Sequence, residues 1–196
     1  MEHIMSDWIA GNRYLTTAEM QNNARMFRGR GLSIGWSSNA IFAMLGNIQA
    51  ESGINPGIWE NLTPYAGGYG LTQWTPYTKY SEWWGEGWEN NGDAQMQRIS
   101  FEAVNDLQWF RNAELGIDPP ITLSEFLVSS LPVEVLTRYW LWFYEHPADP
   151  GTETQNTRIS YAMAWEDFFK IPAWLLFKFG GGKLRQTRLI PIGKLT

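Results

Sequence analysis

A regular spacing of apolar residues over residues 39–51 predicts the best-defined helix of the chain. The apolar side chains recur at steps of three and four residues, which places them on one face of a helix. They are Ile41, Met44, Leu45 and Ile48. Such a face packs against a hydrophobic core, so this helix is expected to lie near the centre of the fold.

Glu51 is expected to stand at the end of this helix, at the edge of its buried face. Gly53 suits a left-handed cap, and Pro56 prevents the helix from continuing. Burial and the negative end of the helix dipole both disfavour a charged carboxylate. The side chain is therefore expected to keep its proton near neutral pH, as a general acid requires. The alternative interpretation is an ordinary glutamate at a helix end.

Similar patterns predict helices along most of the remaining chain. Thr16 with Glu19, and Thr122 with Glu125, have the spacing of a capping box, which marks a helix start. Pro132 suits the first turn of another helix. Helical spacing of apolar residues also covers residues 95–110, 133–144 and 158–169. The expected fold is α+β and predominantly α-helical, with one small β-hairpin.

The β-hairpin is predicted from glycines that follow the helix ending at Glu51. Gly67, Gly68 and Gly70 stand close together in the sequence, and glycine in a two-stranded turn indicates positive φ or a close backbone approach. A tight turn without a binding role is the alternative for these glycines alone. Opposite Glu51, such a hairpin would border a cleft that admits a bulky polymer.

The order of these motifs resembles the phage tail lysozyme family. The matching segments are Glu51-Ser52, Asn55-Pro56, Gly68-Tyr69-Gly70-Leu71-Thr72-Gln73-Trp74-Thr75-Pro76 and Tyr144-Glu145-His146-Pro147. The Glu-Ser and Gly-Leu-x-Gln motifs are also similar to those of goose-type lysozymes and lytic transglycosylases. The resemblance implies a lysozyme-like fold whose hairpin lines the cleft. It also implies a virion protein of the phage tail that cleaves peptidoglycan between N-acetylmuramic acid and N-acetylglucosamine during cell-wall penetration.

The same resemblance implies roles for individual residues. Glu51 maps onto the general acid, and Gly70, Leu71 and Gln73 map onto a hairpin that contacts the substrate. Gln73 could bond an N-acetyl or hydroxyl group of a sugar, or it could fasten the hairpin to the helix through the backbone. Trp74 offers an aromatic face to a sugar ring. The candidate substrate-binding set is Ser52, Tyr69, Gly70, Leu71, Gln73 and Trp74.

The sequence leaves open which group assists Glu51. Retaining and inverting glycosidases both use two carboxyl groups, at different separations. The candidates for the second carboxylate are Glu60, Glu82, Glu86, Glu89, Asp93 and Glu145. Without one of them beside Glu51, an acetamido or 6-hydroxyl group of the substrate could take that role. Use of the 6-hydroxyl would make the protein a lytic transglycosylase.

Composition narrows the chemistry further. A chain of 196 residues with 44% hydrophobic and 18% charged residues can bury one sizeable core. It has no cysteine, which excludes disulfides and thiolate nucleophiles. The two histidines, His3 and His146, lack the spacing of metal ligands. No metal or cofactor is therefore expected, and His146 is interpreted as a loop or capping residue.

Charge divides the chain near residue 170. All 20 acidic residues precede residue 171, whereas residues 171–196 contain basic residues and no acidic one. We therefore expect a lysozyme-like domain over 1–170 and a basic, apolar tail over 171–196 that docks onto other phage tail proteins or extends the chain. The acidic body disfavours nucleic-acid binding, and neither a secretory signal nor a transmembrane segment is expected. The rival hypothesis is a catalytically silent module that binds the cell wall or has a structural role in the tail.

Overall fold

The computed structural model describes residues 7–147 and 151–170, and within these residues the chain is predominantly helical, as the sequence predicts. The helical elements are α1 (Thr17–Ser33), α2 (Ser38–Ser52), the 3₁₀ turn η1 (Glu60–Leu62), α3 (Thr78–Trp84), α4 (Gly92–Val104), α5 (Leu123–Leu127), α6 (Val133–Trp140), the π-helical turn η2 (Leu141–Glu145) and α7 (Thr152–Lys170). None of these helices is both long and apolar enough to cross a membrane. The expected tail over 171–196 lies outside the described residues.

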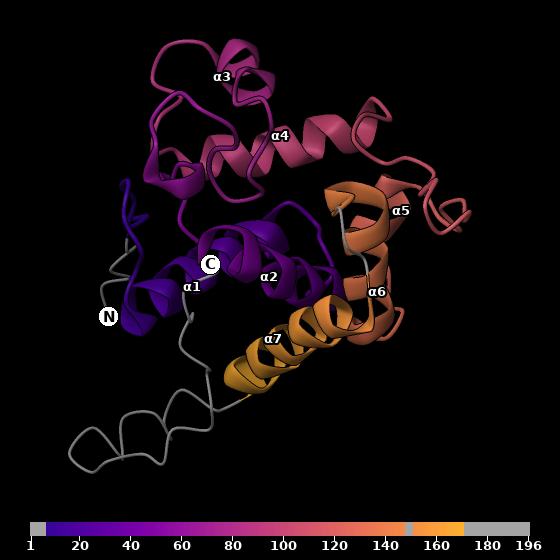
Figure 1. Ribbon diagram of the computed structural model, residues 1–196. Coiled ribbons are helices and arrows are strands. Elements are labelled where there is room, and N and C mark those ends of the chain that lie inside the picture. The colour runs from indigo at the N-terminus through magenta and orange to yellow at the C-terminus, as the bar shows by residue number, and fades with distance from the viewer. Residues whose placement is uncertain (1–6, 148–150, 171–196) are drawn as a thin grey trace, which may run out of the picture.

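Helix α2 lies at the centre of the fold, with α4 above it and α7 below it (Figure 1). Residues 40–49 are all buried, because neighbouring elements cover α2 on every side and not along one face only. Gly46 allows the closest of these contacts. A Cβ atom at this position would lie 2.6 Å from the Cβ of Ala162 and 2.6 Å from the carbonyl oxygen of Arg158. Helices α2 and α7 therefore pack backbone against backbone.

The predicted helix starts are confirmed. Thr16 and Thr122 each accept a hydrogen bond from the backbone N–H of the glutamate three residues further on. The side chains of Glu19 and Glu125 accept the backbone N–H of these threonines in return, which completes both capping boxes. Pro132 is the residue that precedes the first turn of α6. These starts depend on contacts within a few residues, so the sequence pattern is sufficient to locate them.

Helix α4 is shorter than its apolar pattern predicts. The prediction extends to residue 110, whereas the helix ends at Val104. Beyond it, Asp106 and Gln108 have φ angles of 50° and 59°. These left-handed conformations are incompatible with a continuous right-handed helix, so residues 105–110 form a loop.

Helix α6 ends in the wide turn η2, where the sequence predicts an uninterrupted helix over 133–144. The backbone N–H of His146 donates to the carbonyl oxygen of Leu141 at 3.1 Å, a step of five residues. His146 closes the turn with a φ of 49°, which agrees with its interpretation as a capping residue. Compared with a regular α-helix, the wide turn rotates the side chains that follow Trp140 to different directions.

The described residues do not show the predicted β-hairpin as a pair of strands. Within the described residues, the glycine-rich segment forms only isolated antiparallel bridges, between Trp59 and Tyr69 and between Tyr69 and Trp74. Gly70 and Gln73 have φ angles of 79° and 51°, which coil the chain into consecutive turns. The Gln73 side chain also donates to the carbonyl oxygen of Gly70 at 2.9 Å, so a local contact occupies an acceptor that a strand ladder would use.

Aromatic packing helps to hold this glycine-rich segment in place. The ring centroids of Trp59 and Tyr69 are 4.6 Å apart, and those of Tyr69 and Trp88 are 4.8 Å apart. Tyr77 and Tyr80 pack against the same rings at 5.0 Å and 6.5 Å. Such separations are typical of favourable aromatic pairs. These rings, together with backbone hydrogen bonds from Glu60 N–H to the Gly68 carbonyl at 2.9 Å and from Gly70 N–H to the Ile58 carbonyl at 3.0 Å, fix the segment next to the end of α2.

Candidate active site

A cleft of about 1260 Å³ opens at the C-terminal end of α2. Its walls are formed by residues 14–17, 49–53, 58–61, 72–75 and 144–146, together with side chains such as Arg158. Pockets that enclose one small molecule measure roughly 300–1,000 Å³. The larger volume here suits an extended ligand.

Glu51 lines this cleft from the last turn of α2, as predicted. Gly53 ends the helix in a left-handed conformation with φ of 61° and ψ of 32°. The side chain of Glu51 is 23% exposed, although most of α2 is buried. The neighbouring Ser52 hydroxyl donates to the carbonyl oxygen of Leu71 at 2.8 Å, which fixes the end of α2 to the glycine-rich segment. Glu51 is thus a carboxyl group held firmly at the border between the core and the cleft.

Arg158 on α7 forms an ion pair with Glu51. Its Nη2 atom lies 2.5 Å from the Oε1 atom of Glu51, and its Nη1 atom donates to the carbonyl oxygen of Asn47 at 3.0 Å. The Arg158 side chain is only 10% exposed. A buried guanidinium beside a carboxyl group stabilises the ionised form. The surroundings of Glu51 are therefore less apolar than the amphipathic pattern of α2 alone indicates.

Glu145, in η2, is the second carboxyl group of the cleft. The indole Nε1 of Trp140 donates to its Oε1 atom at 2.6 Å. Burial raises the pKa of Glu145 well above the ordinary value, and the negative charge of Glu51 raises it further, while Arg158 and the Trp140 hydrogen bond act in the opposite direction. The cleft therefore combines an ion-paired carboxylate with a carboxyl group that favours its neutral form.

The other five candidates for the second carboxylate either lie outside the cleft or are held by another contact. Glu60 lines the cleft, but its Oε2 atom accepts the backbone N–H of Gly68 at 2.8 Å. Asp93 pairs with Arg30 and accepts the indole N–H of Trp8, away from the cleft. The side chains of three further candidates do not line the cleft, namely Glu82, Glu86 and Glu89. Of the six, Glu145 is the one whose electrostatic coupling to Glu51 is direct.

The predicted substrate-binding residues divide into two groups. Ser52, Gln73 and Trp74 line the cleft. Gln73 donates to the carbonyl oxygens of Gly70 and Ile58 at 2.9 Å and 3.3 Å, so its amide fastens the loop through the backbone. The predicted alternative is a contact between the hairpin and the helix, whereas both acceptors lie in the loop, and contact with a substrate stays a prediction for Ser52, Gln73 and Trp74.

Tyr69, Gly70 and Leu71 lie behind the cleft wall and do not line it. The Tyr69 hydroxyl accepts the backbone N–H of Asn90 at 2.8 Å, and burial raises the pKa of Tyr69 to about 12. The backbone N–H of Leu71 donates to Oε1 of Gln95 at 2.7 Å. A Cβ atom at Gly70 would lie 2.5 Å from the same oxygen. Gly70 is therefore required by a close protein contact in this structure.

Glu102 is a buried residue that sequence reasoning missed. It is 1% exposed and accepts hydrogen bonds from Trp74 Nε1 at 3.0 Å, Arg98 Nε at 2.8 Å and the Tyr144 hydroxyl at 2.5 Å. Burial raises the pKa of Glu102, while these donors lower it in part. The four-residue spacing of Arg98 and Glu102 was the available signal. Through Trp74 and Tyr144, Glu102 joins two walls of the cleft.

The described residues provide no group of three or more histidine, cysteine, aspartate or glutamate side chains placed to hold a metal ion. His146 lines the cleft, and its Nε2 atom lies 3.0 Å from the carbonyl oxygen of Phe143. This contact holds the ring against its own turn. Within the cleft, the carboxyl of Glu145 and the guanidinium of Arg158 are the groups that act electrostatically on one another and on Glu51.

The chain is similar to known phage proteins. The family model described as phage tail lysozyme matches residues 22–169. The chain is also 39% identical over 158 residues to "Morphogenesis protein 1" of Bacillus phage B103, an alignment that covers 76% of this chain and 40% of that relative. The chain thus spans less than half the length of this relative. With its helical fold and cleft, it is a lysozyme-like phage protein and belongs to the phage tail lysozyme family.

Proposed function

We propose that this chain cleaves the glycan strands of peptidoglycan, between N-acetylmuramic acid and N-acetylglucosamine, while a phage tail penetrates the cell wall. The observation that carries the proposal is the pair of carboxyl groups, Glu51 and Glu145, in one extended cleft. Glycosidases of most families act through two such groups. Membership of the phage tail lysozyme family supports the choice of substrate.

In the proposed mechanism Glu51 protonates the glycosidic oxygen. We assign one proton to this pair of carboxyl groups. We place this proton on Glu145 in the free protein, because burial raises the pKa of Glu145 while Arg158 forms an ion pair with Glu51. A bound sugar excludes water from Glu51 and raises the cost of its ionised form. The proton then passes to Glu51, which donates it to the leaving oxygen as the glycosidic bond breaks.

Glu145 has a second role in this mechanism. Once it has given up its proton, its negative charge stabilises the positive charge that develops on the sugar ring. It can next take a proton from an attacking water molecule, which returns the pair to its initial state. This sequence yields hydrolysis. A lytic transglycosylase would instead release anhydro-sugar ends, and mass spectrometry of the released fragments separates the two reactions.

The first test is clearing of a cell-wall gel by the purified chain and by Glu51→Gln. General acid catalysis contributes about 10²- to 10⁴-fold to such reactions, so the variant should lose clearing at comparable protein amounts. Glu134→Gln is the matched control, because Glu134 is an exposed glutamate of α6 outside the cleft. Equal clearing by the parent chain and Glu51→Gln would end the assignment of Glu51. Absence of clearing by all three folded proteins would favour the catalytically silent tail module.

A location in the virion is part of the proposal. The phage relative and the family support a virion-associated protein, and the basic, apolar segment 171–196 is proposed to dock onto other tail proteins. Mass spectrometry of purified particles tests this location. A lysin released only at host lysis would be absent from them.

A further inference from the structure

The segment of residues 7–16, here called the N-terminal strap, forms one wall of the cleft although it precedes the family match. The match begins at residue 22, whereas Tyr14, Leu15 and Thr16 line the same cleft as Glu51. The strap also reaches the opposite loop. The Asn12 side chain accepts the backbone N–H of Trp59 at 3.1 Å and donates to the carbonyl oxygen of Leu62 at 2.9 Å.

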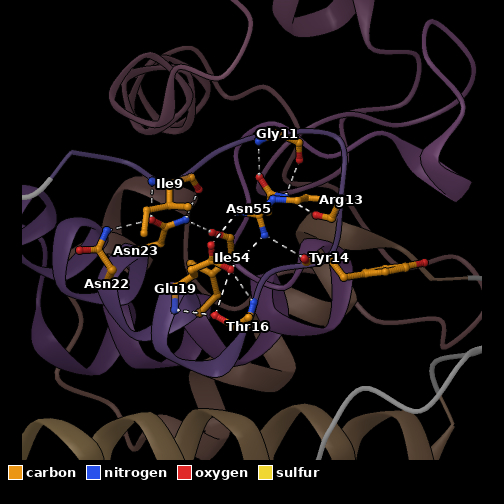
Figure 2. Close-up of polar contacts among 10 residues, drawn as sticks. All are labelled: Ile9, Gly11, Arg13, Tyr14, Thr16, Glu19, Asn22, Asn23, Ile54 and Asn55. Carbon is orange, nitrogen blue, oxygen red and sulfur yellow. Dashed lines mark hydrogen bonds and ion pairs between the residues drawn. The ribbon is translucent and has the colours of Figure 1, made fainter.

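Asn55, just beyond the end of α2, holds the middle of the strap (Figure 2). Its Nδ2 atom donates to the carbonyl oxygens of Gly11 and Arg13 at 2.8 Å and 2.7 Å. Its Oδ1 atom accepts the backbone N–H of Gly57 at 2.9 Å and that of Gly11 at 3.3 Å. Asn55 is completely buried. The strap is therefore fixed to the same turn that positions Glu51.

Asn23 of α1 fixes the first part of the strap in the same way (Figure 2). Its side chain accepts the backbone N–H of Ile9 at 2.9 Å and donates to the carbonyl oxygens of Ile9 and Ile54 at 2.7 Å and 2.8 Å. At the far end, Arg13 pairs with Glu19 at 2.6 Å, within the capping box of α1. The backbone on both sides of Tyr14 is thus anchored by buried or ion-paired groups.

The ring of Tyr14, in contrast, is open to solvent. Figure 2 shows it pointing away from the polar contacts that hold the strap. Tyr14 is 63% exposed, whereas Trp59 and Trp74, which also line the cleft, are 5% and 3% exposed. Within the described residues, no ring contact or side-chain hydrogen bond involves Tyr14. A rigid backbone that presents a free aromatic face is typical of a preformed ligand platform.

From this arrangement we propose that Tyr14 is a sugar-stacking residue of the glycan-binding cleft, and that the N-terminal strap forms a binding subsite outside the segment that matches the family. The inference rests on the proposed function, which supplies an amino-sugar polymer as the occupant. A pyranose ring presents C–H groups on its face, and an aromatic face buries them favourably. The neighbouring Thr17, which also lines the cleft, offers a hydroxyl group to the polar edge of such a ring.

Binding of soluble peptidoglycan strands by isothermal titration calorimetry tests this subsite. The measurements use the Glu51→Gln background, in which the ligand is not consumed. Tyr14→Ala should raise the Kd by roughly 2- to 12-fold, the range expected for loss of one aromatic contact. Tyr14→Phe should leave the Kd unchanged, because it keeps the ring face. Tyr65→Ala is the control for loss of an equally exposed ring: Tyr65 is also 63% exposed and does not line the cleft, although its ring packs on that of Trp59 at 5.0 Å.

Each outcome has a distinct meaning. Weaker binding by Tyr14→Ala alone supports the subsite. Equal Kd values for Tyr14→Ala and the Glu51→Gln background would overturn the subsite and leave the proposed function intact. An equal loss in Tyr14→Phe and Tyr14→Ala would overturn the stacking role in favour of the hydroxyl. Absence of glycan binding by the Glu51→Gln background would overturn both proposals. Circular dichroism checks that all variants are folded.

Discussion

Glu51 and Glu145 line one cleft from two distant parts of the chain, and the negative charge of Glu51 raises the pKa of Glu145. Arg158 acts on both carboxyl groups, since it forms an ion pair with Glu51 and lowers the pKa of Glu145. Three side chains from α2, η2 and α7 thus form one electrostatic unit. Substitution of any one of these side chains should therefore change the electrostatic environment of the other two.

The raised pKa of Glu145 predicts a pH-dependent stability. A carboxyl group that binds its proton more tightly in the folded protein contributes stability below its unfolded pKa, near 4.5, and loses it as the pH rises through the folded pKa. The free energy of unfolding should therefore fall as the pH rises above about 4.5. Glu145→Gln should show a shallower fall, measured by urea denaturation at several pH values. Because the pKa of Glu102 is also raised, part of the dependence should persist. Identical slopes for both proteins would contradict the burial of a neutral Glu145.

Loss of the Arg158 guanidinium should destabilise the fold. Arg158→Met leaves the Glu51 carboxylate without its partner and the carbonyl oxygen of Asn47 without this donor. Removal of one partner from a largely buried pair costs about 3–5 kcal/mol, and the partial exposure of Glu51 reduces this to about 2–4 kcal/mol. Urea denaturation measures the change. Arg111→Met is the control, since the Arg111–Asp118 pair is exposed and contributes about 0–1 kcal/mol. An equal loss of unfolding free energy in both variants would show that the Arg158–Glu51 pair stabilises the fold no more than an exposed pair does.

Removal of the Asn55 side chain should release the N-terminal strap. Asn55→Ala removes the side-chain partner of backbone groups of Gly11, Arg13 and Gly57, of which the Gly57 N–H is buried, at about 1–3 kcal/mol for each group that water cannot reach. We expect a total loss of about 2–4 kcal/mol, because water can reach part of the strap. Asn105→Ala is the control, since Asn105 is exposed and bonds only a carbonyl of its own helix. A small loss in Asn55→Ala, comparable with the control, would show that the strap is held by other contacts.

Gly46→Ala and Gly29→Ala should have opposite effects on stability. Both glycines lie within helices, but an added Cβ at Gly46 meets α7 at 2.6 Å, whereas nothing lies within 4 Å of one at Gly29. Overpacking costs about 1–3 kcal/mol, while alanine in an open helical position adds roughly 0.5–1 kcal/mol. Thermal unfolding measures both changes. Stabilisation by Gly46→Ala would show that α2 and α7 can separate without cost.

Local features of the fold could be predicted from the sequence because their causes are local. The capping boxes at Thr16 and Thr122 and the left-handed cap at Gly53 each involve residues within four positions of one another. The same holds for the position of Glu51 at the end of α2. The glycine-rich segment did not follow its local pattern, because Gln73 and Gln95 form side-chain contacts that replace a strand ladder.

The electrostatic environment of the cleft could not be predicted in this way. The pairing of Glu51 with Arg158 joins residues that are 107 positions apart, and it depends on how closely α2 and α7 approach at Gly46. The selection of Glu145 among six acidic residues depends on η2, which no apolar spacing indicates. Tyr14 escaped notice for a similar reason, since a short irregular strap has no periodic signal.

Because of the wide turn η2, the geometry of the cleft depends on the number of residues in the segment 141–145. Trp140 and Glu145 are five residues apart and bonded to each other, whereas in a regular α-helix a step of five residues turns the side chain well away from its starting direction. A π-helical turn contains one residue more than an ordinary turn. Deletion of a single residue from 141–145 would therefore swing Glu145 by roughly 100° around the helix axis. Insertions and deletions, more than substitutions, should be the changes that this part of the molecule tolerates least.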